Sequence, residues 1–140
     1  MLIILDSLTL ILLVLGWWAA IASYPALPET IPVHFGWNGR ADGWGGRWMI
    51  FLMPVIATLI VALNGFVFTK LTGSPKMPAA MALPLHLMTL ELAALFAYIT
   101  WRMCEVAFER AEGLGTWFVP VVMLATMGTG AWMVIAGKTH

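Results

Sequence analysis

The sequence has few charged residues. Only 10% of its 140 residues are Asp, Glu, Lys or Arg, whereas 61% are hydrophobic. A water-soluble domain has roughly a quarter charged residues, so this composition leaves too little polar surface for solvation by water. Because lipid is itself apolar, the composition predicts an integral membrane protein surrounded by the lipid bilayer. The length suits one domain over residues 1–140.

An excess of charge of either sign is also absent. The chain has seven basic and seven acidic residues, so the attraction that dominates nucleic-acid binding is missing and no nucleic-acid partner is expected. The single thiol, Cys104, excludes an internal disulfide and a cysteine-rich metal site. The sequence shows no Ser/His/Asp arrangement, phosphate-cradling loop or His-x-x-x-His pair. We therefore expect no cofactor, and an enzyme is the less favoured class.

Long apolar runs are what the sequence has in abundance. Four of them cover about residues 2–24, 48–69, 79–103 and 114–136. A helix of about 20 to 25 residues spans about 30 Å of hydrocarbon, and it satisfies its own backbone hydrogen bonds. The sequence therefore predicts an all-α membrane protein, a bundle of four transmembrane helices. The first run is expected to be retained, because no basic segment precedes it as in a signal peptide.

The tryptophans support four crossings. Seven of the eight lie on one side of the membrane if the chain crosses four times, and Trp132 lies towards the other. Tryptophan favours the headgroup region, where its ring is in apolar surroundings and its N–H finds a partner. Three basic residues lie on one side and four on the other, so the positive-inside rule does not decide the orientation.

The linker at residues 25–47 is predicted to be ordered. Its three prolines fix φ and favour extended backbone in the preceding residues. Asn38-Gly39 and Asp42-Gly43 are both turn dipeptides, and Gly45-Gly46 allows a close entry into the second helix. We expect a structured Pro/Gly-rich loop between helices 1 and 2, folded over the helix ends.

This loop also holds the candidate ligand-binding residues. They are His34, Asn38, Arg40, Asp42 and Arg47, together with Trp37 and Trp44. Aromatic walls with a few polar groups are typical of ligand pockets. His34 and Asp42 are weak candidates for a metal site as well, although their spacing matches no known metal motif. The alternative is that both hold the loop in shape through hydrogen bonds to its backbone.

Polar residues also occur inside the predicted spans. Glu91 lies near the middle of the third span, where a carboxylate costs at least about 2.5 kcal/mol on insertion scales. We expect it to face the bundle and to be protonated or paired. It shares a helical stripe with Tyr98, seven residues further on. The alternatives are a proton or substrate site and a structural hydrogen bond to a neighbouring helix.

A second intramembrane group is expected nearer the second linker. His86 and Asn64 fall at similar depth, and Asp6 and Thr129 could join them in an interhelical hydrogen-bond layer. A buried proton relay is the sharper alternative. Asp6 could instead cap the first helix, as Asp often does. Pro120 is expected to kink the fourth span.

The long linker resembles a known family. The string Leu27-Pro28-x-x-Ile31-Pro32-x-His34-Phe35, followed by Gly39, Asp42-Gly43-Trp44-Gly45 and a basic residue at 47, is similar to the signature of a bacterial membrane domain of unknown function. That domain opens the SdpI family of immunity and signalling proteins, which protect a bacterium from a secreted toxic peptide and can hold a repressor at the membrane. The resemblance covers about residues 10–70. It implies a loop that faces outwards from the bacterial cytoplasmic (inner) membrane and cytoplasmic termini.

Three functions stay open at this point. The first is an SdpI-like protein that binds an amphipathic ligand, such as a toxic peptide or lipid, at its outward loop in immunity or signalling. The second is an accessory or assembly subunit of a larger membrane complex, with a membrane protein partner or a second copy of itself. The third is an intramembrane enzyme or transporter that uses Glu91 and His86.

Overall fold

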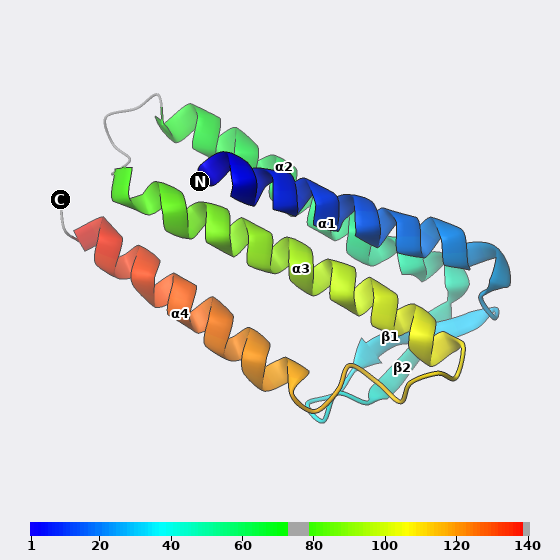
Figure 1. Ribbon diagram of the computed structural model, residues 1–140. Helices are drawn as coiled ribbons and strands as arrows, with labels where there is room; N and C mark the ends of the chain where they lie inside the picture. The colour runs from blue at the N-terminus through cyan, green and yellow to red at the C-terminus, as the bar shows by residue number, and fades with distance from the viewer. Residues whose placement is uncertain (73–78, 139–140) are drawn as a thin grey trace.

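The computed structural model describes residues 1–72 and 79–138. Its long helices are α1 (Leu2–Ser23), α2 (Leu52–Thr72), α3 (Ala82–Ala107) and α4 (Phe118–Lys138). They run along one another, with successive helices in opposite directions (Figure 1). All four are long and apolar enough to cross a membrane. The predicted all-α membrane fold with four transmembrane helices is therefore confirmed.

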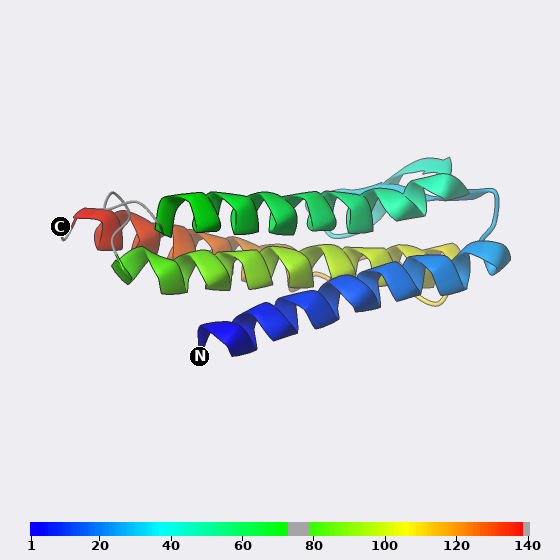
Figure 2. The ribbon, with the colours of Figure 1, turned by 90° about the horizontal axis from the view of Figure 1, so that it is seen from above.

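The third helix is central. α3 contacts α1, α2 and α4, and α4 lies on the opposite side of α3 from the other two helices (Figure 1). Seen from above, α1 diverges from α2 towards the N-terminus (Figure 2). The bundle is thus narrower at the end where α1 leads into the hairpin and wider at the end that holds both termini.

The long linker forms a β-hairpin. A 3-10 turn (Tyr24–Ala26) follows α1, β1 (Thr30–Phe35) pairs antiparallel with β2 (Ala41–Gly46), and a second 3-10 turn (Arg47–Phe51) leads into α2. The predicted order of this loop is confirmed, whereas its strand pairing was not predicted.

The hairpin turn lies at only one of the two predicted turn dipeptides. At Asn38-Gly39 the chain reverses: the Gly39 amide donates to the Gly36 carbonyl at 2.8 Å, and Gly39 has a φ of 75°, which glycine adopts readily. Asp42-Gly43 lies inside β2, so that turn prediction is wrong. The reason for glycine at 43 is close approach, because a Cβ there would lie 2.8 Å from the Cβ of His34.

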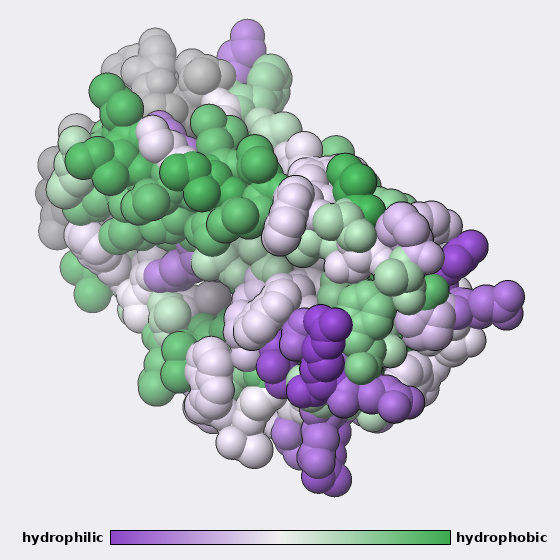
Figure 3. Space-filling model, turned by 45° about the vertical axis from the view of Figure 1, so that its right-hand side comes forward, coloured by the Kyte–Doolittle hydropathy of each residue, from purple (hydrophilic) through white to green (hydrophobic). Residues whose placement is uncertain are grey.

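The main apolar core lies beneath the hairpin. Ile31 of β1 and Ile50 are fully buried, and they pack with Ala20, Met103 and Cys104 at the ends of α1 and α3. Elsewhere the helices expose many large apolar side chains, as expected for surfaces that face lipid. Many hydrophilic side chains gather at the hairpin end of the molecule (Figure 3).

Three predicted helix starts are displaced along the chain, and that of α3 moves to Ala82 because Ala79–Met81 form a 3-10 turn. α2 begins at Leu52 because residues 47–51 form the 3-10 turn, and α4 begins at Phe118. Before α4, Gly115 has a φ of 94°, which is incompatible with a right-handed helix. Pro120 consequently lies in the first turn of α4, where proline is tolerated, so its position gives no reason for the kink predicted in the fourth span.

Candidate functional site

The outer face of the hairpin brings His34 and Asp42 together. Nδ1 of His34 donates to Oδ1 of Asp42 at 2.5 Å across the two strands. A carboxylate only accepts hydrogen bonds, so the pair places an imidazole proton on Nδ1. The two side chains are 71% and 52% exposed. Trp44 follows Asp42 by two residues on β2, which puts both on the same face, and it is also exposed.

Other predicted loop residues have contacts that hold the hairpin in place. The side-chain oxygen of Asn38 accepts from the Arg40 amide at 3.0 Å. Arg40 donates to Oε2 of Glu112 at 2.7 Å, and the Arg47 guanidinium lies over the Tyr24 ring at 5.2 Å from its centroid. These contacts are structural. A role in ligand binding for Asn38, Arg40 and Arg47 stays a prediction.

The segment between α3 and α4 is bound to the hairpin turn. The Leu114 amide donates to the Gly39 carbonyl at 2.7 Å, and Arg40 forms a β-bridge with Gly113. Nε of Arg102, on α3, donates to the Gly113 carbonyl at 2.7 Å. The two polar segments at this end therefore form one cap. Sequence reasoning did not find this junction, because its contacts are mainly between backbones.

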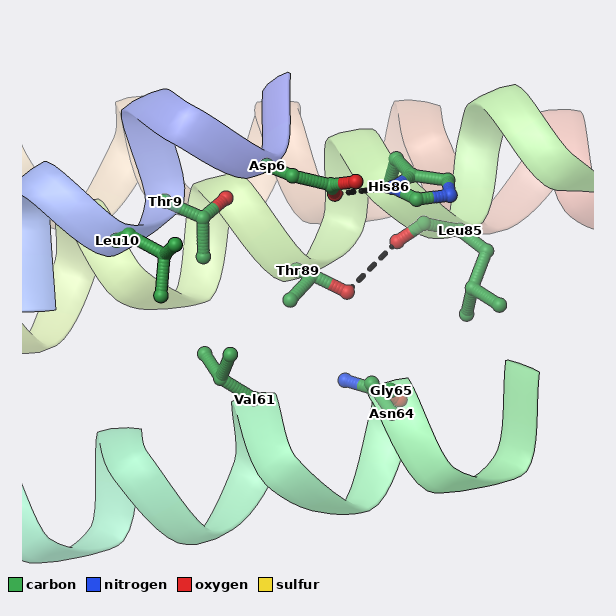
Figure 4. A pocket seen from close by; sticks show the side chains of 9 residues that line it. All are labelled: Asp6, Thr9, Leu10, Val61, Asn64, Gly65, Leu85, His86 and Thr89. Atoms are coloured by element: carbon green, nitrogen blue, oxygen red, sulfur yellow. Dashed lines mark hydrogen bonds and ion pairs between the residues drawn. The ribbon is translucent and has the colours of Figure 1, made fainter. Parts of the chain in front are cut away.

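A pocket lies towards the opposite end, between α1, α2 and α3 (Figure 4). Its volume is about 310 Å³, and it is lined by Asp6, Thr9, Leu10, Val61, Asn64, Gly65, Leu85, His86 and Thr89. Nδ1 of His86 donates to Oδ1 of Asp6 at 2.6 Å. Asn64 approaches the pocket from α2, across from this pair (Figure 4). The pocket is therefore mostly apolar with a few polar groups that converge on it.

The predicted polar layer is present only in part. Asp6, His86 and Asn64 surround one pocket, as expected. Thr129 does not join them, because its hydroxyl donates to Oε1 of Glu91 at 2.6 Å. Asp6 does not cap α1 either: the helix begins after Met1 without a capping side-chain hydrogen bond.

Glu91 lies in a separate groove between α3 and α4. The groove has a volume of about 240 Å³ and is lined by Glu91, Ala94, Leu95, Tyr98, Trp117, Phe118, Val121, Val122, Ala125 and Thr126. The predicted stripe is confirmed in that Glu91 and Tyr98 line the same groove. Oε2 of Glu91 is buried and has no hydrogen-bond partner among the residues that the structure describes.

The metal hypothesis gains no third ligand. Within residues 1–72 and 79–138, no group of three or more His, Cys, Asp or Glu side chains is placed to hold a metal ion. His34 and Asp42 offer two ligands that are already bonded to each other. Zinc sites in proteins use at least three protein ligands, so this pair alone is a poor candidate.

Four apolar spans, a polar cap and polar groups between the spans define the chain as a multi-pass α-helical membrane protein. Residues 11–58 match a family model described as a domain of unknown function, DUF1648. The match runs from α1 through the hairpin to the start of α2, so it includes His34 and Asp42.

A curated protein is similar to part of the chain. An uncharacterized protein of Archaeoglobus fulgidus is 36% identical over 64 residues, which are 46% of this chain and 34% of that protein. The chain therefore spans about a third of the length of that relative. No solved structure matches the chain.

Proposed function

We propose that the chain is a small SdpI-like membrane protein that binds an amphipathic ligand, a toxic peptide or lipid-like molecule, at the outward face of its hairpin. The ligand would serve an immunity or signalling role. The domain match supports this proposal because it centres on the hairpin, the same segment that carries the SdpI-like string. The cap end of the molecule would then face the outside of the cell.

The observation that carries the proposal is the exposed pair of His34 and Asp42. The hairpin is already held by its inner face, where Ile31 is fully buried, and by its backbone pairing. An exposed ion pair stabilises a fold by only about 0.2–1 kcal/mol, so stability gives little reason for the pair. Its geometry instead holds the imidazole in one tautomer and orientation, ready to bind a polar group.

The surroundings of the pair favour an amphipathic ligand. Trp44 offers an apolar ring with an N–H donor beside the polar pair, and Trp37 is exposed at the tip of the hairpin. Tryptophan is typical of the membrane headgroup region. A molecule with one polar and one apolar face, lying at that depth, would contact the rings and the polar pair at once.

The proposal is tested by binding to purified protein in phosphatidylcholine nanodiscs. The probe is a synthetic amphipathic Lys/Leu peptide without tryptophan, followed through the protein's own tryptophan fluorescence. We expect His34→Ala and Asp42→Ala to weaken binding at least about tenfold, because a hydrogen bond to a charged group contributes about 1.5–3 kcal/mol. Arg110→Ala is the matched control, since it removes an exposed partner of Glu105 at the same end.

Two results would oppose the proposal. One is unchanged peptide affinity in both hairpin variants. The other is a fixed partner protein that co-purifies in mild detergent with the wild type and is lost from the variants, which would favour an accessory subunit of a larger complex.

A further inference from the structure

The groove at Glu91 lies deep within the apolar length of the protein. At 1.5 Å per residue, Glu91 is about 14 Å from the start of α3 and about 24 Å from its end. The whole of α3 is long and apolar enough to cross the membrane. A charged carboxylate at this depth is costly, so a proton or a cation is expected to accompany it.

One oxygen of the Glu91 carboxyl is left without a partner in the described part of the chain. Thr129 donates to Oε1 at 2.6 Å, whereas Oε2 is buried and unbonded there. Thr126 also lines the groove, but its hydroxyl donates to the Val122 carbonyl of its own helix at 2.8 Å. Buried polar atoms in proteins are nearly always bonded, so the remaining oxygen indicates a missing partner.

Aromatic rings form the other end of the groove. Tyr98 stacks on Phe118 with centroids 4.8 Å apart, and the Trp117 centroid lies 5.6 Å from that of Tyr98. The Tyr98 hydroxyl donates to the Leu114 carbonyl at 2.8 Å, which fixes the ring. The faces of such rings attract cations. A carboxyl and an aromatic cluster therefore share one groove, about 10 Å apart along α3.

Among the residues that the structure describes, Glu91 is the only charged side chain that lines the groove. Besides Tyr98 and Cys104 of α3, the charged or titratable residues on the helices that pack around it, within the described ranges, are His86 and Asp6, which bond each other, Arg102 and Glu105 towards the cap end of α3, and Lys70 and Lys138 at the other end of the bundle. Along α3, His86 is about 8 Å from Glu91 and Arg102 about 17 Å. A positive partner for Glu91 would therefore have to come from outside the described chain.

We propose that this groove binds a lipid-soluble cation, an ammonium or phosphonium centre carried on apolar groups, in exchange for a proton on Glu91. As the cation binds, the proton leaves the carboxyl for water, so the charge of the occupied site stays zero. A small metal ion would find too few oxygen ligands, since Ca²⁺ takes six to eight. The groove is smaller than the roughly 300–1,000 Å³ of typical ligand pockets, so part of the cation stays in lipid.

The test compares two ions of the same shape and opposite charge. Tetraphenylphosphonium and tetraphenylborate each carry four phenyl groups, so they separate charge recognition from simple partition into lipid. Binding is measured by equilibrium dialysis with wild-type protein in phosphatidylcholine nanodiscs, against empty nanodiscs. We expect saturable binding of the phosphonium and none of the borate. Equal saturable binding of both ions, or of neither, would overturn the proposal.

Variants and the pH dependence of phosphonium binding test whether the cation binds at Glu91. Glu91→Gln is expected to weaken phosphonium binding at least about tenfold, whereas Glu105→Gln, a change at the cap end of α3, leaves it unchanged. Wild-type affinity falls as pH is lowered, approaching about tenfold per pH unit where the proton competes, and this dependence is lost in Glu91→Gln. Unchanged affinity in Glu91→Gln, or affinity that rises as pH falls, would contradict the exchange. If that variant does not fold, the ion comparison and pH series on the wild type still decide.

Discussion

The two ends of the molecule are held together in different ways. At the cap end, large apolar side chains such as Ile31 and Ile50 are fully buried, and two polar segments are joined through their backbones. At the other end, α1 diverges from α2 and a pocket with an Asp6–His86 pair lies between the helices (Figures 2 and 4). The close packing thus lies where the chain leaves the predicted spans.

The difference follows from the solvent. Burial of apolar surface stabilises a fold because the surface leaves water, so it acts strongly at the cap. Between helices in lipid this driving force is absent, and small residues and polar contacts hold the helices instead. The buried residues within the spans away from the cap fit this rule, because apart from prolines they are small or carry a hydroxyl: Thr9, Gly16, Ala57, Ala93, Thr100, Thr129 and Ala136.

The largest effect is expected from a cavity beneath the hairpin. Ile31→Ala should lower the free energy of unfolding by about 2–5 kcal/mol, because Ile31 is fully buried in the cap core. Leu59→Ala, at a residue of α2 that is itself 64% exposed, should change it by less than about 0.5 kcal/mol. Unfolding in mixed micelles, followed by tryptophan fluorescence, measures both. Equal losses of unfolding free energy in the two variants would contradict the difference between the buried cap core and the exposed helix surface.

The junction of the two polar segments should be the next most sensitive place. A Cβ at Gly113 would collide with the backbone of Gly39 and lie 2.9 Å from the Cα of Arg40. We expect Gly113→Ala to cost about 2–3 kcal/mol in the same assay. Gly128→Ala is the control, since nothing lies within 4 Å of a Cβ there, and it should stabilise the helix by up to about 1 kcal/mol. A neutral Gly113→Ala would show that the junction is dispensable.

The smallest effects should distinguish the polar pairs at the two ends. Double-mutant cycles are expected to give about 0.6–1.7 kcal/mol for Asp6 with His86, the range found between membrane helices. Arg40 with Glu112 lies in water with both side chains exposed, so we expect about 0.5 kcal/mol or less, falling further at high salt. A larger coupling energy for Arg40 with Glu112 than for Asp6 with His86 would contradict this expectation.

Most of the fold could be predicted from the sequence, because membrane spans depend on length and apolar composition. The strands of the hairpin, in contrast, could not be predicted. Prolines and glycines indicated an ordered loop, but β2 contains three glycines in six residues, which weakens any strand signal. Its pairing depends on close approach to β1, where Gly43 lies opposite His34. Such a contact depends on both strands at once, so the pattern of one segment alone does not predict it.

The contacts of the candidate sites could also be predicted only in part. His34 and Asp42 lie in one short loop, so their proximity could be expected, and the Asp6–His86 contact follows from similar depth in two helices that run in the same direction. Thr129 was placed with the wrong group, because depth alone does not give the rotation of a helix about its axis. The Gly39–Leu114 contact could not be predicted, since it uses backbone atoms that every residue has.

The backbone bridge between Arg40 and Gly113 also sets an order of assembly during biosynthesis. The hairpin is synthesised before α3 and α4, and its partner segment follows only after α2 and α3 have been made. The cap therefore closes only after α2 and α3 have crossed, and a closed cap reports that the first three spans have been inserted. A chain that ends after α2 would have a hairpin that an added protease cleaves, whereas the full chain would protect it.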